Sequence, residues 1–222
     1  MKKLFVLFAA GTFALASCQD APKADKVEAK DAQAVTAPAT GATYKADPAQ
    51  SRIEWTGTKP VGKHHGTFIL KEGNLMADAG NITGGKFSID INSLKADDQD
   101  SVGNGKLAGH LLSPDFFDAA KFPEGTFEIT AVKAGIDTSL NKGEVVMKDA
   151  THTITGNLTL KGVTKSISFP AKVAITDAQI TTDANFNIDR TQWGMSYGND
   201  KSLQDKFIRP EVNMMLHIVA TK

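Results

Sequence analysis

Residues 151–175 read THTITGNLTLKGVTKSISFPAKVAI, and this stretch decides the fold. In its first half the odd positions are polar, most of them threonine, while the even positions carry His152, Ile154, Gly156, Leu158 and Leu160. A period of two is typical of a strand with one face in water and one face buried. The alternation stops at 161–165. From residue 166 onward it resumes with the apolar residues at odd positions, such as Ile167 and Phe169. We therefore expect two antiparallel strands, 151–161 and 166–175, joined by a short glycine-containing turn.

Similar alternation predicts further strands at 51–58, 65–70, 86–92, 126–133, 144–148, 185–189 and 212–220. The last of these also has Met215 and Val219 on its second face, so we expect both of its faces to be covered. About eight antiparallel strands would expose unpaired edges unless the sheet closed. The fold class is therefore all-β, an antiparallel barrel, and barrels of this size can hold one small ligand.

One helical insert interrupts the strands. Leu107, His110 and Leu111 have the i, i+3, i+4 spacing of a short amphipathic helix, with Asn104 as its expected N-cap. Ser113, followed by proline, resembles a second helix start.

The composition limits the classes of partner. The chain has 222 residues, equal numbers of acidic and basic side chains and a formal net charge of zero. A neutral chain without a basic patch is poorly suited to bind a polyanion, so we expect no nucleic-acid partner.

The N-terminus has the features of an export signal. Residues 1–17 combine two lysines with a short apolar run, and the segment ends Leu15-Ala16-Ser17-Cys18, which resembles the bacterial lipoprotein processing box. We expect a lipoprotein whose Cys18 carries acyl chains such as palmitate, with an ordinary cleaved signal as the alternative. Because Gln19 is not the aspartate that retains many lipoproteins at the inner membrane, we expect an outer-membrane anchor facing the periplasm.

The next segment differs in composition from the rest. Residues 18–43 contain almost no large apolar side chains, so we expect a disordered tether there and a folded domain over 44–222.

Three ordered blocks carry a family resemblance. Residues 109–118 read GHLLSPDFFD, residues 155–165 read TGNLTLKGVTK, and Ile188-Asp189-Arg190 is followed by Trp193-Gly194. Together they resemble the YceI family of bacterial exported proteins, from about residue 44 to the end. The opening departs from the common pattern, because Trp55 with Lys59-Pro60 replaces the usual Phe-rich start.

The resemblance implies an extended lipocalin-like barrel that holds a long isoprenoid lipid, such as a polyprenyl phosphate or a quinone tail. It implies no catalytic residues and no cofactor other than the lipid, so we expect a binding protein and not an enzyme. The alternatives are a quinone- or metal-dependent redox protein or enzyme, and a filled structural barrel without a ligand. A homodimer also stays open.

The inward-facing residues are the candidate ligand contacts. An apolar interior can line a cavity or can simply be a packed core. In the same way, the residues of the helical insert can gate the barrel mouth or plug it. The candidates are Ile53, Trp55, Phe68, Phe87, Ile89, Leu107, Leu111, Phe116, Phe117, Phe127, Ile129, Leu158, Phe169, Phe186, Trp193 and Leu216.

Arg190 is the candidate for binding a charged head group, because a guanidinium can grip a phosphate with two hydrogen bonds. A salt bridge at one end of the barrel is the alternative.

The histidines do not form a chelating motif. His64 and His65 are adjacent, so on a strand they point to opposite faces, and we expect no metal site from them. His110 and His152 lie on apolar faces, where a hydrogen-bonded core histidine is the simplest interpretation. A metal or haem site formed by His110, His152 and His217 is the alternative.

The alternation yields a direct test. Leu158→Asp places a carboxylate on the buried face and should destabilise the fold by about 4 kcal/mol or abolish lipid uptake. Thr159→Asp faces water and should do neither. Urea unfolding of both variants is the measurement, and equal behaviour of the two would mean that the predicted strand register is wrong.

Overall fold

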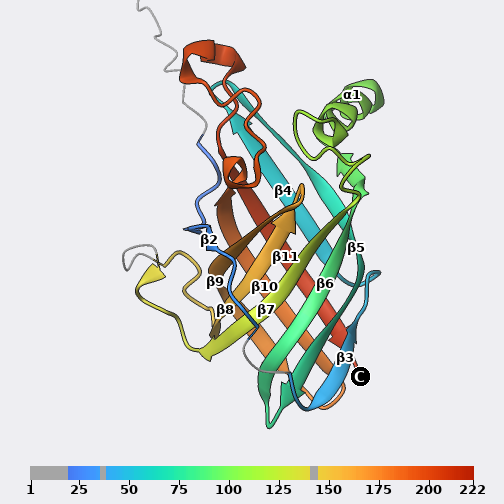
Figure 1. The fold of residues 1–222 in the computed structure, drawn as a ribbon, viewed down its shortest axis with the longest axis vertical. Coiled ribbons are helices and arrows are strands. Elements are labelled where there is room, and N and C mark those ends of the chain that lie inside the picture. Colours follow the sequence, from blue (N-terminus) through green and yellow to red (C-terminus); the bar gives the residue numbers. More distant parts are fainter. Residues whose placement is uncertain (1–19, 36–38, 141–144) are drawn as a thin grey trace, which may run out of the picture.

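A computed structural model describes residues 20–35, 39–140 and 145–222 of the chain. Eight long antiparallel strands form a closed barrel, in which each strand pairs with the next and the last pairs with the first (Figure 1). This all-β barrel agrees with the sequence prediction. The strands are β4 (Arg52–Lys59), β5 (Gly62–Asp78), β6 (Asn81–Ala96), β7 (Glu124–Ala134), β8 (His152–Leu160), β9 (Val163–Ile175), β10 (Gln179–Asp189) and β11 (Glu211–Thr221).

The β8–β9 hairpin matches the prediction closely. Its two turn residues, Lys161 and Gly162, both have positive φ, 48° and 74°. Positive φ at both positions is the geometry of a type I′ turn, which suits the right-handed twist of the flanking strands. Gly162 is required for a second reason, because a Cβ there would lie 2.6 Å from the Phe122 ring.

Strands β5 and β6 are much longer than predicted. They contain 17 and 16 residues, and their register shifts at three places, between Thr67 and Ile69, Leu70 and Glu72, and Met76 and Ala77. Each shift interrupts the alternation of inward and outward side chains. Strict alternation in the sequence therefore covers only parts of these strands, and the prediction was limited to 65–70 and 86–92.

A short strand, β3 (Ala42–Ala46), completes the wall at one end of the barrel. It pairs with β5 and β11 beyond the point where β4 begins. The turn between β3 and β4 continues this pairing, since the Asp47 amide donates to the Val219 carbonyl at 2.8 Å. Val219 is buried, as predicted, whereas Met215 is 47% exposed, so the predicted cover of that face was wrong there.

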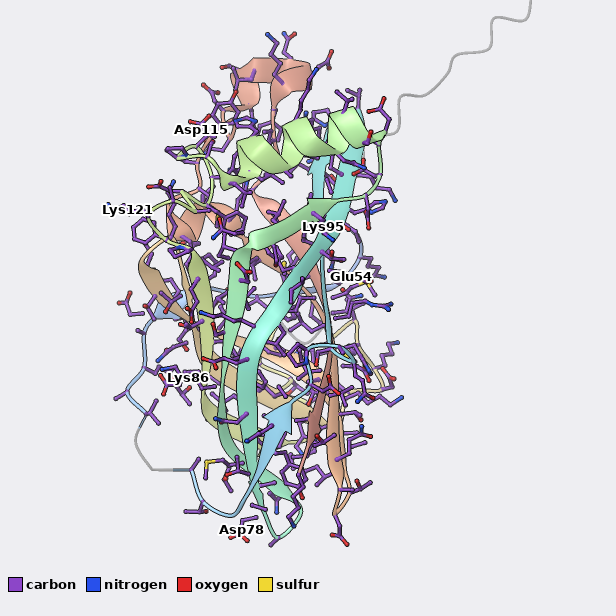
Figure 2. All side chains as sticks on the ribbon, turned by 90° about the vertical axis from the view of Figure 1, so that its right-hand side faces the viewer. Glu54, Asp78, Lys86, Lys95, Asp115 and Lys121 are labelled. Carbon is purple, nitrogen blue, oxygen red and sulfur yellow. The ribbon has the colours of Figure 1, made fainter. Side chains whose placement is uncertain are left out.

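The helix α1 (Ser101–Leu112) lies across the opposite end of the barrel from Asp78 (Figure 2). Its N-cap is Asp100, whose carboxylate accepts from the Gly103 amide at 2.7 Å, so the helix starts before the predicted cap, Asn104. The predicted second start at Ser113 was also wrong. Ser113 is instead the C-cap of α1, and turns follow it. None of the helices in the described ranges combines the length and hydrophobicity needed to span a bilayer.

The strand predicted at 144–148 is absent from its described part, 145–148, which forms bends and turns. Its alternating Val and Met side chains suggested a ladder, but the amides of Val146 and Met147 both donate to the Asp25 carboxylate, at 2.8 and 3.0 Å. A side chain thus takes the place of a neighbouring strand.

The segment 20–35, here called the N-terminal strap, is ordered, so the prediction of a disordered tether was wrong for these residues. It contains β1 (Asp25–Lys26) and β2 (Lys30–Asp31). Ala24 and Val27 are buried, and Asp25 is only 1% exposed. Composition predicted disorder because the strap has few apolar residues, but its order comes from backbone pairing with strands that follow much later in the chain. Cys18 and Gln19 lie outside the described residues.

The strap fills a seam in the barrel wall. Strands β9 and β10 pair with each other only over 171–175 and 180–184. Beyond that point β10 pairs with β1 at Phe186 and Asn187, and β9 pairs with β2 at Lys165 and Ser166. Val27, between the two short strands, packs into the main core cluster. The strap therefore supplies hydrogen bonds to two edges that the barrel strands leave open.

Asp25 should be the main attachment of the strap. Asp25→Ala removes a buried acceptor of two amides and should lower the free energy of unfolding by about 2 kcal/mol. Amides of Val146 and Met147 should then exchange faster with deuterium. The control is Asp31→Ala, since Asp31 has a fully exposed side chain paired with Lys165 at 3.2 Å and its loss should change nothing measurable. Equal effects of the two variants would contradict this assignment.

Candidate functional site

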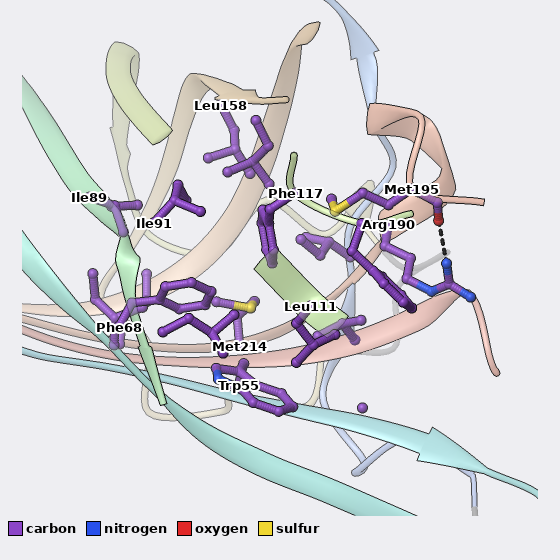
Figure 3. A pocket seen from close by; sticks show the side chains of 18 of the residues that line it. Trp55, Phe68, Ile89, Ile91, Leu111, Phe117, Leu158, Arg190, Met195 and Met214 are labelled. Atoms are coloured by element: carbon purple, nitrogen blue, oxygen red, sulfur yellow. Dashed lines mark hydrogen bonds between the residues drawn. The ribbon is translucent and has the colours of Figure 1, made fainter. Parts of the chain in front are cut away.

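The barrel encloses a cavity of about 510 Å³ (Figure 3). Its wall consists mainly of aliphatic and aromatic side chains, and it receives residues from every strand from β4 to β11 and from α1. Binding sites for small molecules in proteins have volumes of roughly 300–1,000 Å³ and are mostly apolar. The interior of this barrel is therefore not filled by its own side chains.

The structure places nearly all of the predicted contact residues on the cavity wall. They are Ile53, Trp55, Phe68, Phe87, Ile89, Leu107, Leu111, Phe116, Phe117, Phe127, Ile129, Leu158, Phe169, Phe186 and Leu216. Their role in binding a ligand stays a prediction. Trp193 does not line the cavity: it is fully buried in the 3-10 helix η2 (Arg190–Trp193), and its Nε1 donates to the Leu158 carbonyl at 3.0 Å.

Sequence reasoning missed a second set of wall residues. Most of them lie on the inward faces of strands that were predicted, where only some of the apolar residues were named as contacts, and the others lie on β5 and β6 beyond the predicted segments or on the segments before β11. The set includes Leu70, Leu75, Ile91, Leu94, Ile154, Leu160, Ile167, Ile188, Met195, Ile208, Val212, Met214 and Ile218. Naming every apolar residue of the predicted inward faces would have found most of them, whereas Leu75 and Leu94 lie outside the predicted segments of β5 and β6.

Aromatic contacts connect the wall to the helical insert. Phe169 stacks on Phe186 with ring centroids 4.4 Å apart, and it also contacts Phe127 at 5.8 Å. Phe117, in the turns after α1, reaches Phe68 on β5 in an edge-to-face contact at 5.5 Å. Leu107 and Leu111 line the cavity although no residue of α1 is fully buried. The insert thus forms a cover over the cavity without filling it.

Polar and charged side chains gather where the wall ends near α1. Lys59, His64, Asp205 and Lys206 line this part of the cavity, together with His110. Lys206 comes from a second short 3-10 helix, η3 (Lys201–Lys206). The cavity therefore has a polar mouth and an apolar interior.

Arg190 lies at the edge of the cavity and binds backbone carbonyls (Figure 3). Its Nε donates to Arg209, its Nη1 to Met195, and its Nη2 to Tyr197 and Ile208 at 2.9 and 3.0 Å. Burial lowers the pKa of the guanidinium, and the nearby Asp189 carboxylate partly offsets this effect. A guanidinium has five N–H donors. One, on Nη1, is left for a ligand, so the head-group interpretation of Arg190 loses most of its basis.

Among the described residues, the salt bridge proposed as the alternative for Arg190 does not form. The neighbouring Asp189 carboxylate instead accepts from the Thr191 amide and hydroxyl at 2.9 and 2.6 Å. Arg190 also lies over the Phe116 ring, 5.3 Å from its centroid. Its role in the structure is to hold the segments 195–197 and 208–209 together at the mouth.

Three buried polar atoms on the cavity wall have no hydrogen-bond partner among the described residues. They are the Trp55 Nε1 and the hydroxyl oxygens of Thr58 and Thr182. Most buried polar atoms in proteins are paired, so unpaired ones around a cavity are candidates for contacts with a ligand.

Four of the five histidines pair with carboxylates, whereas the His152 ring contacts the Thr151 hydroxyl at 2.9 Å. His64 contacts Asp98 at 2.8 Å and His65 contacts Asp97 at 2.6 Å. Burial raises the pKa of Asp98, but hydrogen bonds from His64 and the His65 amide outweigh this, so the pKa lies below its usual value. The possible ligand atoms of His65, Asp97 and Asp98 lie within 4.8 Å of one another.

The alternative site formed by His110, His152 and His217 is not assembled among the described residues. His217 pairs with Asp183 on the outer surface, and His110 is partly exposed and pairs with Asp115 at 3.0 Å. The interpretation of His110 as a core histidine was therefore wrong, since its ring lies at the mouth against Phe116 and Tyr197.

Comparison with known protein families gives a match to the YceI-like domain over residues 44–220. The chain belongs to the YceI-like family. The sequence resemblance drawn from its three motif blocks is thereby confirmed. The N-terminal strap precedes the YceI-like match, so the seam is closed by residues outside the family domain.

Curated relatives agree with this assignment. The proteins named YceI of Salmonella arizonae and Salmonella newport are 37% identical to the chain over 108 residues, 49% of this chain and 44% of each relative. The match thus spans less than half the length of these relatives.

Two solved structures share the YceI-like barrel. BcnA of Burkholderia cenocepacia has a TM-score of 0.60 at 22% identity, covering 79% of this chain and 99% of that protein. A polyisoprenoid binding domain from Saccharophagus degradans has a TM-score of 0.54 at 18% identity, covering 80% and 97%. At these identities the likeness establishes the fold.

Arg190 should be required for the mouth of this YceI-like barrel. Lysine cannot reproduce a planar fork of donors, so Arg190→Lys should lower the free energy of unfolding by about 3 kcal/mol. The amides of residues 208 and 209 should lose protection in hydrogen exchange. The control is Arg52→Lys, at a side chain that is 71% exposed. An Arg190→Lys variant as stable as the control would refute the structural role.

Proposed function

We propose that this YceI-like protein binds a long-chain isoprenoid lipid in its barrel and shields or ferries it in the bacterial cell envelope. The observation that carries the proposal is the apolar cavity of about 510 Å³ that runs inside the barrel. A filled structural barrel, the simplest alternative, does not agree with a cavity of this size.

The chemistry of the wall suits such a cargo. An isoprenoid tail has no hydrogen-bonding groups, so it needs a wall that offers none. Each Å² of apolar surface removed from water contributes about 25 cal/mol of favourable free energy. A long tail has a large apolar surface, so its burial in the cavity is strongly favourable. Phe, Ile and Leu side chains dominate the wall, and the flexible Met195 and Met214 can adapt to the branches of the tail.

The comparisons support a lipid of this class. The Saccharophagus degradans domain with the same fold is described as polyisoprenoid binding. The proposed role is that of a binding protein, and we assign no catalytic residue. Either a polyprenyl phosphate or a quinone-like lipid would fit the tail-binding part of the cavity.

The proposed location follows from the N-terminal sequence. Cleavage before Cys18 and acylation of its sulfur would anchor the protein, and Gln19 favours the outer membrane, facing the periplasm. A cavity for a lipid beside a membrane anchor is consistent with exchange of cargo with the bilayer.

Extraction tests the proposal directly. The protein purified from its host should release a prenyl lipid, near one copy per chain, into organic solvent, and mass spectrometry identifies it. A clean extract, together with no uptake of added prenyl lipid, would refute the proposal, while turnover of a substrate or stoichiometric metal would favour an enzyme or redox protein.

A cavity-filling variant provides the mutational test. Gly57 lines the cavity, and a Cβ added there would meet no atom within 4 Å, so Gly57→Leu should fit without strain and occupy ligand space. We expect lipid uptake to fall about tenfold, on the order of 1.4 kcal/mol, with unchanged thermal stability. Thr56→Leu, one residue earlier on the outward face, is the matched control and should bind normally. Unchanged uptake by Gly57→Leu would place the ligand elsewhere.

A further inference from the structure

The two tryptophans of the chain differ in one respect. Both are buried: Trp193 is 0% exposed and Trp55 is 7% exposed. The Trp193 indole N–H donates to the Leu158 carbonyl at 3.0 Å, as buried indoles usually do. The Trp55 indole N–H has no partner among the described residues, and its ring lies on the cavity wall. The same chemical group is thus satisfied in the packed core and unsatisfied in the cavity.

The two cross-strand neighbours of Trp55 offer it no strong acceptor side chain. On β4 it stands between Gly66 of β5 and Met214 of β11. Glycine has no side chain, and a thioether is a weak acceptor that can move aside. An indole N–H is a fixed donor that cannot rotate away, unlike the unpaired hydroxyls of Thr58 and Thr182. Leaving such a donor buried disfavours the empty protein and favours any ligand that brings an oxygen to it.

There is space for a head group beside the indole. Ile53, Trp55 and Gly57 follow one another on the inward face of β4, and the open space at Gly57 lies on the side toward the mouth. A ligand whose tail extends into the apolar interior would thus place its polar end beside Trp55 and Gly57.

The charges of the cavity indicate which kind of head group fits there. Arg190 uses four of its donors on backbone carbonyls. Lys59 and Lys206 lie at the mouth, and Asp205 with them. A phosphate drawn in as far as Trp55 would have to pass beyond these lysines at the mouth and lose its water, which is costly, whereas a neutral oxygen would pair with the indole without this cost.

We propose that Trp55 recognises the polar end of the bound isoprenoid through its Nε1–H, and that it selects a neutral carbonyl oxygen, as in a quinone, over a phosphate. This inference rests on the proposed function, because it specifies the ligand of the same cavity. Trp55 is then a specificity-determining residue, and the tail-binding wall serves any isoprenoid.

Three probes with the same tail separate the role of Trp55 from isoprenoid binding itself. They are a prenyl quinone, the prenyl hydrocarbon without oxygen, and the prenyl phosphate. Calorimetric titration of the purified protein should give the quinone an affinity about tenfold higher than the hydrocarbon, the effect of one buried hydrogen bond. Trp55→Phe should lose this preference. Thr56→Leu, on the outward face of the same strand, should keep it.

A spectroscopic measurement on the unaltered protein makes the result independent of the variant's folding. The chain has two tryptophans, so its ¹⁵N–¹H spectrum has two indole signals. The quinone should move the Trp55 signal downfield and leave that of Trp193 in place, and the hydrocarbon should not produce the downfield shift.

The outcomes distinguish the two proposals. Equal affinities for quinone and hydrocarbon, tighter binding of the phosphate, or a quinone preference that survives in Trp55→Phe would each overturn the role of Trp55 and leave isoprenoid binding intact. Failure of the protein to bind any of the three probes would overturn the proposed function itself, and the role of Trp55 with it.

Discussion

Closure of the strand ladder is the constraint on which the rest of the structure depends. Each inward face becomes part of the interior only because β11 pairs with β4 and completes the ring. Closure fixes the width of the barrel through the number of strands, and side chains of ordinary size then leave a central space. Closure thus sets the width of the interior, the size of the inward side chains decides that a cavity is left, and their apolar character decides what can occupy it.

The strand ladder is interrupted at one place, between β9 and β10. The N-terminal strap, which lies outside the family domain, supplies the missing backbone pairing there. Where β9 and β10 separate, the strap pairs with both edges, and Asp25 attaches it to the loop before β8. At the mouth, Arg190 works in a similar way, since it satisfies carbonyls of segments that no strand reaches. Both residues are buried and charged, and both bind backbone groups that have no strand partner.

The sequence allowed the barrel and much of the apolar cavity wall to be predicted, because both depend on alternation, which is local. Leu158 and Thr159 show this, since Leu158 is buried, as predicted for an even position of β8, and Thr159 is partly exposed, as predicted for an odd one. The register shifts of β5 and the order of the strap could not be read in the same way. A register shift breaks the local pattern, and residues 25–31 are ordered by partners more than a hundred positions away. The same limit applies to the tryptophans, since only the folded chain brings the Leu158 carbonyl to Trp193 and leaves Trp55 without an acceptor.

If Cys18 is acylated as proposed, the course of the strap would also set the orientation of the molecule on a membrane. The Asp20 carboxylate pairs with Arg209 at 3.0 Å, and the Arg209 amide donates to Thr58, a residue of the cavity mouth. Two residue steps, at most about 7 Å of chain, separate Cys18 from Asp20. With acyl chains on Cys18, the opening of the barrel would face the lipid headgroups. A long isoprenoid could then pass between the bilayer and the protein with little exposure to water.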